Sequence, residues 1–223
     1  MGAVTKQKWI AIDVLVSSWY LAPTTSVRDA DHDVIGLFET IGSLHNTALD
    51  EFRVWALDNG CFSGSWTEDR WRHMIAAYSP ESRDRCLFCV VPDVVYDCDA
   101  TLAQFTHYAP IVRDHGYPVA LVTQDGLIPE RVPWDEIDAL FIGGSDTHKR
   151  GNEGMRLIVA GQNRGKWVHV GRVNSVYAIE RLFWMADSWD GTTGAISPRN
   201  IRPIAAAVRR VRAKKERQLC FSW

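Results

Sequence analysis

The sequence predicts an α/β protein of the (β/α)8 TIM-type barrel class, and two observations carry the prediction. Short apolar runs with little alternation recur along the chain, and amphipathic stretches separate them, which is typical of a parallel sheet covered by helices. The repetition continues through 223 residues without a linker or low-complexity segment, so a single barrel domain over residues 1–223 is favoured over an open sheet. No glycine-rich fingerprint follows the first run, which weighs against a dinucleotide-binding fold.

The predicted strands are the apolar, β-branched runs. They span residues 9–16, 52–60, 86–95, 118–126, 139–146, 167–173 and 187–192. These are seven, and the eighth is weak: it lies within residues 31–40 or is absent. Cys86 and Cys89 form a CxxC pair in one run, but residues i and i+3 of a strand point to opposite faces, so we expect two packed thiols rather than a shared metal.

Helices are predicted between these runs. They span residues 67–79, 100–116, 154–165 and 175–186, and a basic helix closes the chain at 201–223. Thr67 followed by two acids is a good N-cap for the first. The second carries apolar residues at i, i+3 and i+4 spacing and ends on Gly116.

Composition limits the function classes. The chain has a net charge of -2, so a nucleic-acid partner would need a local basic face. The run 209–217 could supply one, although its more ordinary interpretation is the solvated end of the last helix. Five cysteines without the spacing of a disulfide framework, and no signal peptide, predict a cytoplasmic protein. No run approaches the roughly 18 apolar residues of a membrane span, so no membrane association is expected.

Polar residues follow most of the predicted strands, where a barrel places its active site. Each could also cap a helix or shape a turn, but their recurrence favours a convergent site. The candidates from successive strand ends are Asp58, Asp93, Gln124, Gly143 with Gly144, His169 with Arg172, and Asp190. Carboxylates can serve as nucleophile and as general acid or base, and amides can read the edge of a heterocyclic base. The sequence has no HExxH motif and no P-loop, so neither a metal nor a cofactor is expected.

In order and approximate spacing, these segments resemble the tRNA-guanine transglycosylases and their DNA-acting relatives. "LDNGCF" resembles the family's "DSGGFQ", "VVPDVV" the strand end that holds the purine-like base, and "ALVTQDG" the "GIVQGG" strand. "FIGGSD" resembles "IGGLAVGE". The stretch from "VHVGRV" to "DSWDGT" resembles "LMGVG", a helix and then "GIDMFDCVLPTR", and "SPRN" echoes "PTRN". The resemblance covers roughly residues 52–200.

Two departures from the family's pattern indicate which of its branches the chain resembles most. The tRNA enzymes carry a CxCxxC zinc site after the nucleophile, whereas only Cys220 follows Asp190 here, so the zinc-binding subdomain is missing. The chain is also shorter, which is more like the compact DpdA-type enzymes that insert 7-deazaguanine into DNA in phages and bacteria. The glutamine of "GGFQ" is absent, and Ser63 occupies its neighbourhood.

The resemblance implies exchange of guanine in DNA for a preQ0-like 7-deazaguanine by double displacement. Asp190 would be the nucleophile and Asp58 the general acid and base. Asp93, Gln124, the amides of Gly143 and Gly144, and His169 would bind the base, while Arg172, Arg199, Arg209 and Arg210 would hold backbone phosphates. The partners would be DNA with a flipped or single-stranded guanine and the free deazaguanine, with a homodimer or a partner protein left open.

Three alternatives stay open at this point. The enzyme could act on tRNA, or it could be a nucleoside or glycoside hydrolase that uses water as acceptor. It could also be a non-catalytic nucleic-acid-binding subunit of a modification complex. Asp187 is a rival nucleophile to Asp190, although it stands at the predicted start of its strand.

Overall fold

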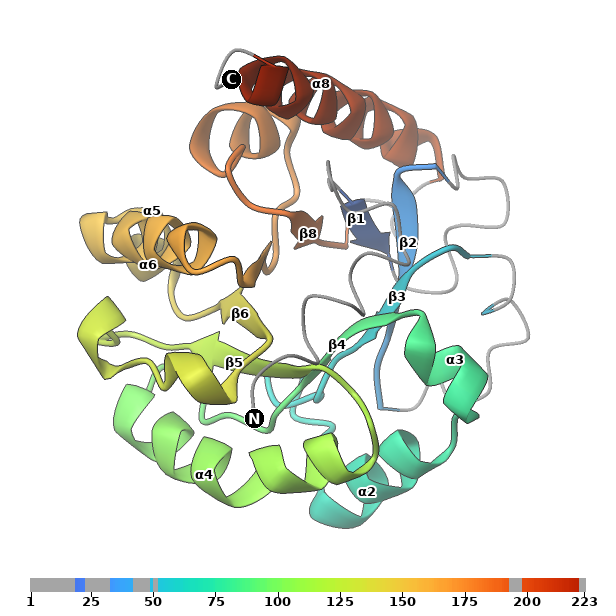
Figure 1. Ribbon diagram of the computed structural model, residues 1–223, viewed down its shortest axis with the longest axis vertical. Helices are drawn as coiled ribbons and strands as arrows, with labels where there is room; N and C mark the ends of the chain where they lie inside the picture. The colour runs from blue at the N-terminus through green and yellow to red at the C-terminus, as the bar shows by residue number, and fades with distance from the viewer. Residues whose placement is uncertain (1–18, 23–32, 42–48, 50–51, 193–197, 221–223) are drawn as a thin grey trace.

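Eight parallel strands close into a barrel in chain order, as the sequence predicts (Figure 1). The computed structural model describes residues 19–22, 33–41, 49, 52–192 and 198–220. The strands are β1 (Trp19–Ala22), β2 (Ile35–Glu39), β3 (Trp55–Leu57), β4 (Cys86–Val90), β5 (Val119–Thr123), β6 (Ala139–Ile142), β7 (Trp167–Val170) and β8 (Ser188–Asp190). Pairing of β1 with both β2 and β8 closes the ring.

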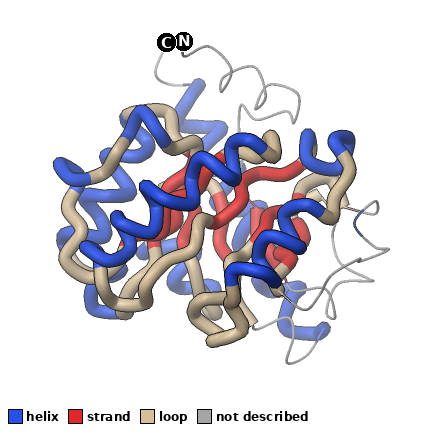
Figure 2. The backbone as a smooth tube through the Cα atoms, turned by 90° about the horizontal axis from the view of Figure 1, so that it is seen from below, coloured by secondary structure: helices blue, strands red, loops and turns tan. Residues whose placement is uncertain are grey.

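Helices surround the strands on the outside of the barrel (Figure 2). The α-helices are α2 (Glu68–Ala76), α3 (Pro80–Asp84), α4 (Cys98–Asp114), α5 (Asp146–Arg150), α6 (Asn152–Asn163) and α8 (Ile201–Cys220). Short helical turns add η4 (Pro129–Arg131), η5 (Trp134–Glu136), η6 (Ala178–Leu182) and η7 (Pro198–Asn200).

Side-chain caps start several of these helices in the loops that follow strands. Thr67 accepts a hydrogen bond from the amide of Arg70, as its position predicts, and Asp97 accepts one from Ala100 at the start of α4. Each cap satisfies an amide that has no partner inside its helix. Some polar residues that follow strands are therefore structural.

The first two strands differ from the prediction. β1 lies at Trp19–Ala22, just beyond the expected run 9–16, which is outside the described residues. The weak eighth strand within residues 31–40 exists and is β2. Its register leaves Gly36 facing the barrel interior, where an added Cβ would stand 2.7 Å from Val54 Cγ2.

The predicted helix over residues 175–186 is much shorter in the structure. Only a π-helical turn, η6, forms there, with Phe183 N donating to the carbonyl oxygen of Ala178. Trp189 on β8 then donates its indole N–H to the carbonyl oxygen of Phe183 at 3.1 Å. The same carbonyl oxygen accepts a hydrogen bond from the amide of Ala186, so a turn follows η6 and leads into β8.

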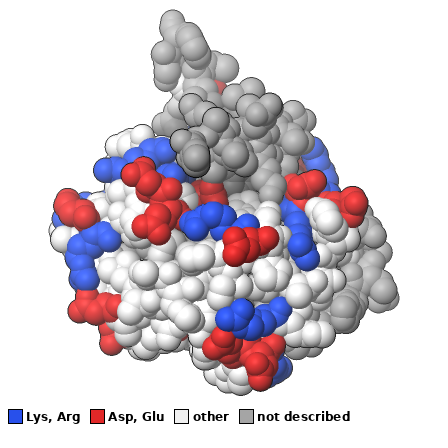
Figure 3. Space-filling model, turned by 60° about the horizontal axis from the view of Figure 1, so that its bottom comes forward, with Lys and Arg blue, Asp and Glu red and all other residues white. Residues whose placement is uncertain are grey.

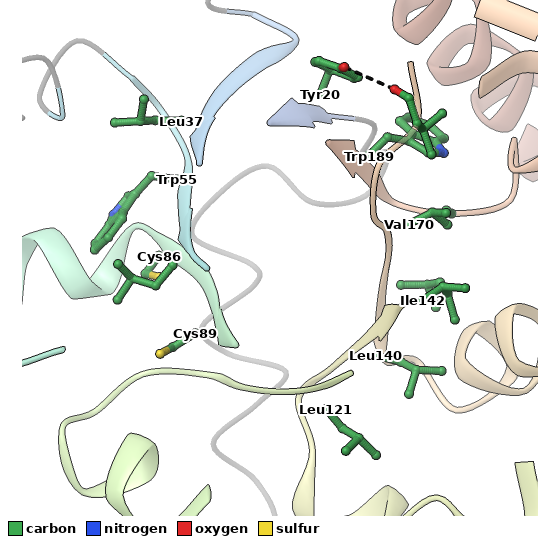
Figure 4. Close-up of a cluster of buried hydrophobic side chains, with 14 of the residues drawn as sticks. Tyr20, Leu37, Trp55, Cys86, Cys89, Leu121, Leu140, Ile142, Val170 and Trp189 are labelled. Carbon is green, nitrogen blue, oxygen red and sulfur yellow. Dashed lines mark hydrogen bonds between the residues drawn. The ribbon is translucent and has the colours of Figure 1, made fainter. Parts of the chain in front are cut away.

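The hydrophobic core has two layers on either side of the barrel wall. Outward-facing strand residues, including Leu37, Leu121, Leu140, Ile142, Val170 and Trp189, pack beneath the helices (Figure 4). A smaller inner cluster fills the barrel and includes Leu21, Val54, Ala56, Val122 and Trp167. This alternation follows from the period of two in a strand.

The prediction that Cys86 and Cys89 face opposite sides is wrong. Trp55 pairs with Cys86 and Leu57 with Cys89, so two residues of β4 between these pairs stand against one residue of β3. Such a bulge inserts one extra residue and reverses the alternation beyond it. Both thiols consequently lie in the outer layer, beside Trp55 (Figure 4).

The described surface shows no large field of one charge on the face in Figure 3, where acidic and basic side chains intermingle. Among the described helices, none has both the length and the apolar character needed to cross a membrane.

Candidate functional site

A cavity of about 410 Å³ opens where the strands end at their carboxyl termini. Residues at or just after the ends of seven strands, β2 to β8, line it. They include Thr40, Asp58, Asn59, Asp93, Gln124, Gly143, Gly144, Arg172, Asn174 and Asp190. The volume is within the range of sites that take a small molecule or a single nucleoside. All of the strand-end residues that the sequence singles out, except His169, therefore converge on one pocket.

Four aromatic rings close the barrel beneath this pocket. Phe38, Phe88, Phe141 and His169 contact one another in all six pairings, with ring centroids 4.5–6.4 Å apart. Phe38 and Phe141 also line the pocket. The polar groups above thus stand on a packed apolar base, which lowers the local dielectric and strengthens the interactions between their charges.

Asp190, the last residue of β8, is held by one oxygen only. Its Oδ1 accepts hydrogen bonds from His169 Nε2 at 2.9 Å and from the amide of Arg172 at 3.2 Å. No residue that the structure describes donates to Oδ2. Because Asp190 lines the pocket and its side chain is 14% exposed, it offers a fixed carboxylate with one oxygen available for chemistry.

Asp58, just after β3, has the properties of a proton donor and acceptor. Burial, and then the charges of Asp190 and Asp93, raise its pKa from 3.8 to about 7. Its Oδ2 accepts a hydrogen bond from Thr40 at 3.2 Å. A carboxyl group with a pKa near neutrality, beside a second carboxylate, is the arrangement that separates acid and nucleophile roles.

Asp93 is fixed by two amides. Asn59 Nδ2 donates to its Oδ1 at 2.7 Å, and Gln124 Nε2 donates to its Oδ2 at 2.5 Å. Burial raises the pKa of Asp93, and these hydrogen bonds oppose the shift. Gln124 is only 3% exposed and also accepts a hydrogen bond from the amide of Tyr96. Within this pocket Gln124 therefore acts on Asp93 and on the loop after β4.

The two glycines after β6 lie at the pocket wall. The Gly143 amide donates to Thr123 Oγ1, so it is already used within the protein. Gly144 has a φ of +75° and accepts a hydrogen bond from the Arg172 guanidinium at its carbonyl oxygen. A side chain at Gly143 would come within 2.6 Å of Val122 Cγ1, so glycine is needed here for close packing.

Arg172 and Phe62 form one side of the pocket mouth. The Arg172 guanidinium lies 4.2 Å from the centroid of the Phe62 ring, which is 59% exposed. Arg172 itself has a φ of +60°, an uncommon backbone conformation that directs its amide to Asp190. A planar cation over an exposed ring can stack against a heterocyclic base.

Four predicted site residues do not reach the pocket. His169 lies beneath it, fully buried, with both ring nitrogens hydrogen-bonded. Arg199 is exposed in η7 and does not line the pocket. Arg209 pairs with Asp33, which precedes β2, at the opposite end of the barrel, and Arg210 pairs with Glu180 in η6.

The structure also separates the two rival nucleophiles. Asp187 stands at the amino end of β8, where it accepts hydrogen bonds from Gln162 Nε2 at 2.7 Å and from the amide of Val168. Lys215 Nζ lies 3.5 Å from Asp187 Oδ1. Asp187 is thus a structural carboxylate at the far end of the barrel from Asp190.

The sequence does not predict the roles of Asn59, which lines the pocket, and Lys149, which lies behind it. Asn59 looks like a turn residue in "DNG", yet it is buried and fixes Asp93. Lys149 in α5 looks like a surface lysine, but it is buried and donates to the carbonyl oxygen of Gly171 at 3.0 Å. Asn59 could have been found from the sequence, since it directly follows a strand-end acid. Lys149 could not, because its burial depends on how the helix packs.

The fold and this geometry define a (β/α)8 barrel with an acidic pocket at its carboxyl end. No family model matches the sequence, and no curated protein matches it. Among solved structures, a chain of tryptophan synthase from M. tuberculosis superposes with a TM-score of 0.50 at 11% identity, covering 94% of this chain and 97% of that one. A protein from Aquifex aeolicus VF5 gives a TM-score of 0.47 at 8% identity, covering 96% and 98%. A mandelate racemase/muconate lactonizing enzyme from Polaromonas sp. JS666 gives a TM-score of 0.43 at 12% identity, covering 79% of this chain and 52% of that one. At these identities the likeness is one of fold alone.

Proposed function

We propose that this chain is an enzyme that exchanges a purine-type base on a sugar by double displacement, with guanine in DNA as the target and a 7-deazaguanine as the incoming base. One observation carries the proposal. A carboxylate with one oxygen fixed and the other unbonded, Asp190, shares a pocket with Asp58, whose pKa is about 7. A nucleophile and a proton-transferring acid in one cleft are what base exchange with retention requires.

In the first half-reaction, Asp190 Oδ2 attacks C1′ of the target nucleotide. The O–C1′ bond forms as the C1′–N9 bond breaks, and the proton of Asp58 passes to the departing guanine. In the second half-reaction, Asp58 takes the N9 proton of the incoming deazaguanine, whose nitrogen attacks C1′. The ester bond to Asp190 breaks, and the enzyme returns to its initial state.

Base recognition falls to the groups around Asp93. A guanine-type ring presents N–H donors on its pyrimidine edge, and a buried carboxylate held by Asn59 and Gln124 is a fixed acceptor for them. Phe62 and Arg172 supply a stacking surface at the mouth. A pocket of about 410 Å³ admits one nucleotide, so the target must leave the helix stack or be single-stranded.

The contacts of Arg209 and Arg210 change one part of the sequence-based hypothesis. Both are paired with acids away from the pocket, so we assign them no phosphate-binding role. Among the described residues that line the pocket, Arg172 is the one cation, and it can meet a backbone phosphate or a base there. The choice of DNA over tRNA rests on the family resemblance alone, so the test must include both.

The proposal is tested with guanine-containing single-stranded DNA, duplex DNA and tRNA, each incubated with preQ0. Intact-protein mass spectrometry looks for a covalent adduct, and nucleoside mass spectrometry looks for incorporated deazaguanine. We expect Asp190→Asn to lower adduct formation by about 10³-fold or more. Asp187→Asn tests the rival acid, and Asp99→Asn, which changes a side chain 79% exposed to solvent, is the matched control.

The outcomes separate the alternatives. Exchange on tRNA but not on DNA would show that tRNA is the substrate. Release of guanine without incorporation of preQ0 would identify a hydrolase. Binding without turnover, unchanged in Asp190→Asn, would favour a non-catalytic subunit. Exchange by Asp190→Asn at the wild-type rate would overturn the assignment of the nucleophile.

A further inference from the structure

A continuous hydrogen-bonded chain runs through the barrel interior to Asp190. Trp167 Nε1 donates to Ser188 Oγ at 2.8 Å, Ser188 Oγ is 2.8 Å from His169 Nδ1, and His169 Nε2 is 2.9 Å from Asp190 Oδ1. Trp167, Ser188 and His169 are buried, and none of them lines the pocket. The proposed reaction gives these three residues no contact with substrate.

The partners determine which way each hydrogen bond in this chain points. Trp167 Nε1 can only donate, so Ser188 Oγ accepts there. Among the described residues, the hydroxyl proton of Ser188 then has one acceptor within reach, His169 Nδ1. An imidazole that accepts at Nδ1 carries its proton on Nε2, and that proton is donated to Asp190 Oδ1.

Strand pairing and ring packing hold the chain in place. His169 pairs with Ser188 across β7 and β8, and Ser188 and Asp190 are two residues apart on one strand, so all three side chains share the inner face. The His169 ring centroid lies 4.5 Å from that of Phe141 and 5.1 Å from that of Phe88. The imidazole can therefore neither rotate nor move away without opening the aromatic cluster.

We propose that Trp167, Ser188 and His169 form a positioning relay that fixes the Nε2–H tautomer of His169 and thereby directs Asp190 Oδ2 into the pocket. The consequence for catalysis rests on the proposed function, whereas the tautomer does not. His169 is accordingly a positioning residue and not the base-binding residue that the sequence suggests. The same logic governs histidines that orient a reacting group through their second nitrogen.

The tautomer is tested by nitrogen NMR of protein labelled with ¹⁵N-histidine, with the His169 resonances assigned by their loss in His169→Gln. We expect Nδ1 to resonate as an unprotonated nitrogen and Nε2 as a protonated one. In Ser188→Ala, which removes the donor to Nδ1, we expect the two nitrogens to move toward a mixture of tautomers. A proton on Nδ1 in the wild type, or no change in Ser188→Ala, would overturn the relay.

The positioning role is tested by a matched pair of variants at one site. In His169→Gln the side-chain amide nitrogen can occupy the place of Nε2 and still donate to Asp190. In His169→Asn it reaches only the place of Nδ1, so the donor to Asp190 is lost. We expect His169→Gln to keep the single-turnover rate of adduct formation within about 10-fold of wild type, and His169→Asn to lose about 100-fold. Oligonucleotide affinity should stay unchanged in both.

Thermal melting shows whether the variants fold, and Ser188→Ala offers a milder change if His169→Asn does not. Equal rate losses in His169→Gln and His169→Asn, with both folded, would refute the positioning role. If the wild type forms no adduct on any nucleic acid while its His169 shows the Nε2–H tautomer, the proposed function fails and the relay stands. If adducts form but the tautomer is reversed, the relay fails alone.

Discussion

Asp58→Asn should stabilise the protein above neutral pH while removing its activity. The folded state raises the pKa of the Asp58 carboxyl group from 3.8 to about 7. Between these values the folded protein holds a proton that the unfolded chain has released, so the free energy of unfolding falls as pH rises. The carboxyl group of Asp58 costs the folded state nothing below pH 3.8, and the protein loses stability progressively as pH rises from there through about 7. Asparagine cannot ionise and avoids that loss.

The structure sets the size of the effect. The interval from 3.8 to about 7 spans roughly three pH units, each equivalent to about 1.4 kcal/mol, which gives a ceiling of about 4 kcal/mol. Asp58 keeps part of its surface at the pocket, and solvent there reduces the gain to about 2 kcal/mol. For a chain of this size that corresponds to a rise in melting temperature of roughly 4–8 °C at pH 8.

The assay is chemical denaturation of wild type and Asp58→Asn from pH 4.5 to 8.5. The difference in unfolding free energy should grow with pH and level off above about 7. Asp146→Asn is the control with opposite sign, because Lys149 lowers the pKa of Asp146 and its carboxylate stabilises the folded state. A variant of Asp58 that is no more stable than wild type at pH 8, or a difference that does not depend on pH, would refute the reasoning.

Three further predictions concern the site and its frame. Release of guanine should slow as pH rises through about 7, because Asp58 must be protonated to donate a proton to the departing base. Incorporation of the second base should slow as pH falls through about 7, because Asp58 must then be ionised to accept a proton. Rapid-quench measurement of each half-reaction checks both. Gly143→Ala should cost about 1–3 kcal/mol, since its Cβ would meet Val122 at 2.6 Å, whereas Gly165→Ala, with open space but a positive φ, should cost about 1 kcal/mol by urea denaturation. Asp97→Ala should lower the free energy of unfolding by about 1 kcal/mol, because α4 loses its side-chain cap. Asp97→Asn should keep that stability, since asparagine can also cap, and neither variant should alter turnover.

The acids that follow strands show where sequence reasoning stops. Asp58, Asp93 and Asp190 follow apolar runs closely, and Asp97 follows the same run as Asp93 a few residues later. In the structure three of them line the pocket, while Asp97 caps α4. Asp97 lies beyond the end of β4, at the far end of the loop that leads into α4, and the period of hydrophobic residues does not encode that difference.

Short strands and local defects set a second limit. The bulge in β4 turns Cys89 to the same side as Cys86. The bulge depends on pairing with β3, which is far away in the chain, so a window of neighbouring residues holds no signal for it. β1 covers four residues, too few for a periodic pattern to stand out.

The sequence by itself determined the barrel class, the order of strands and helices and the end of the barrel where a polar site would form. Repeated apolar runs can be buried on both faces only in such a covered parallel sheet, and parallel strands bring their carboxyl ends to one side. Only the tertiary structure decided that Asp190 is held by His169, that Asp187 belongs to the opposite end, and that Arg209 and Arg210 serve ion pairs there and in η6. Those assignments depend on distances between residues that are far apart in the chain, and the pairing of strands and the packing of helices fix them.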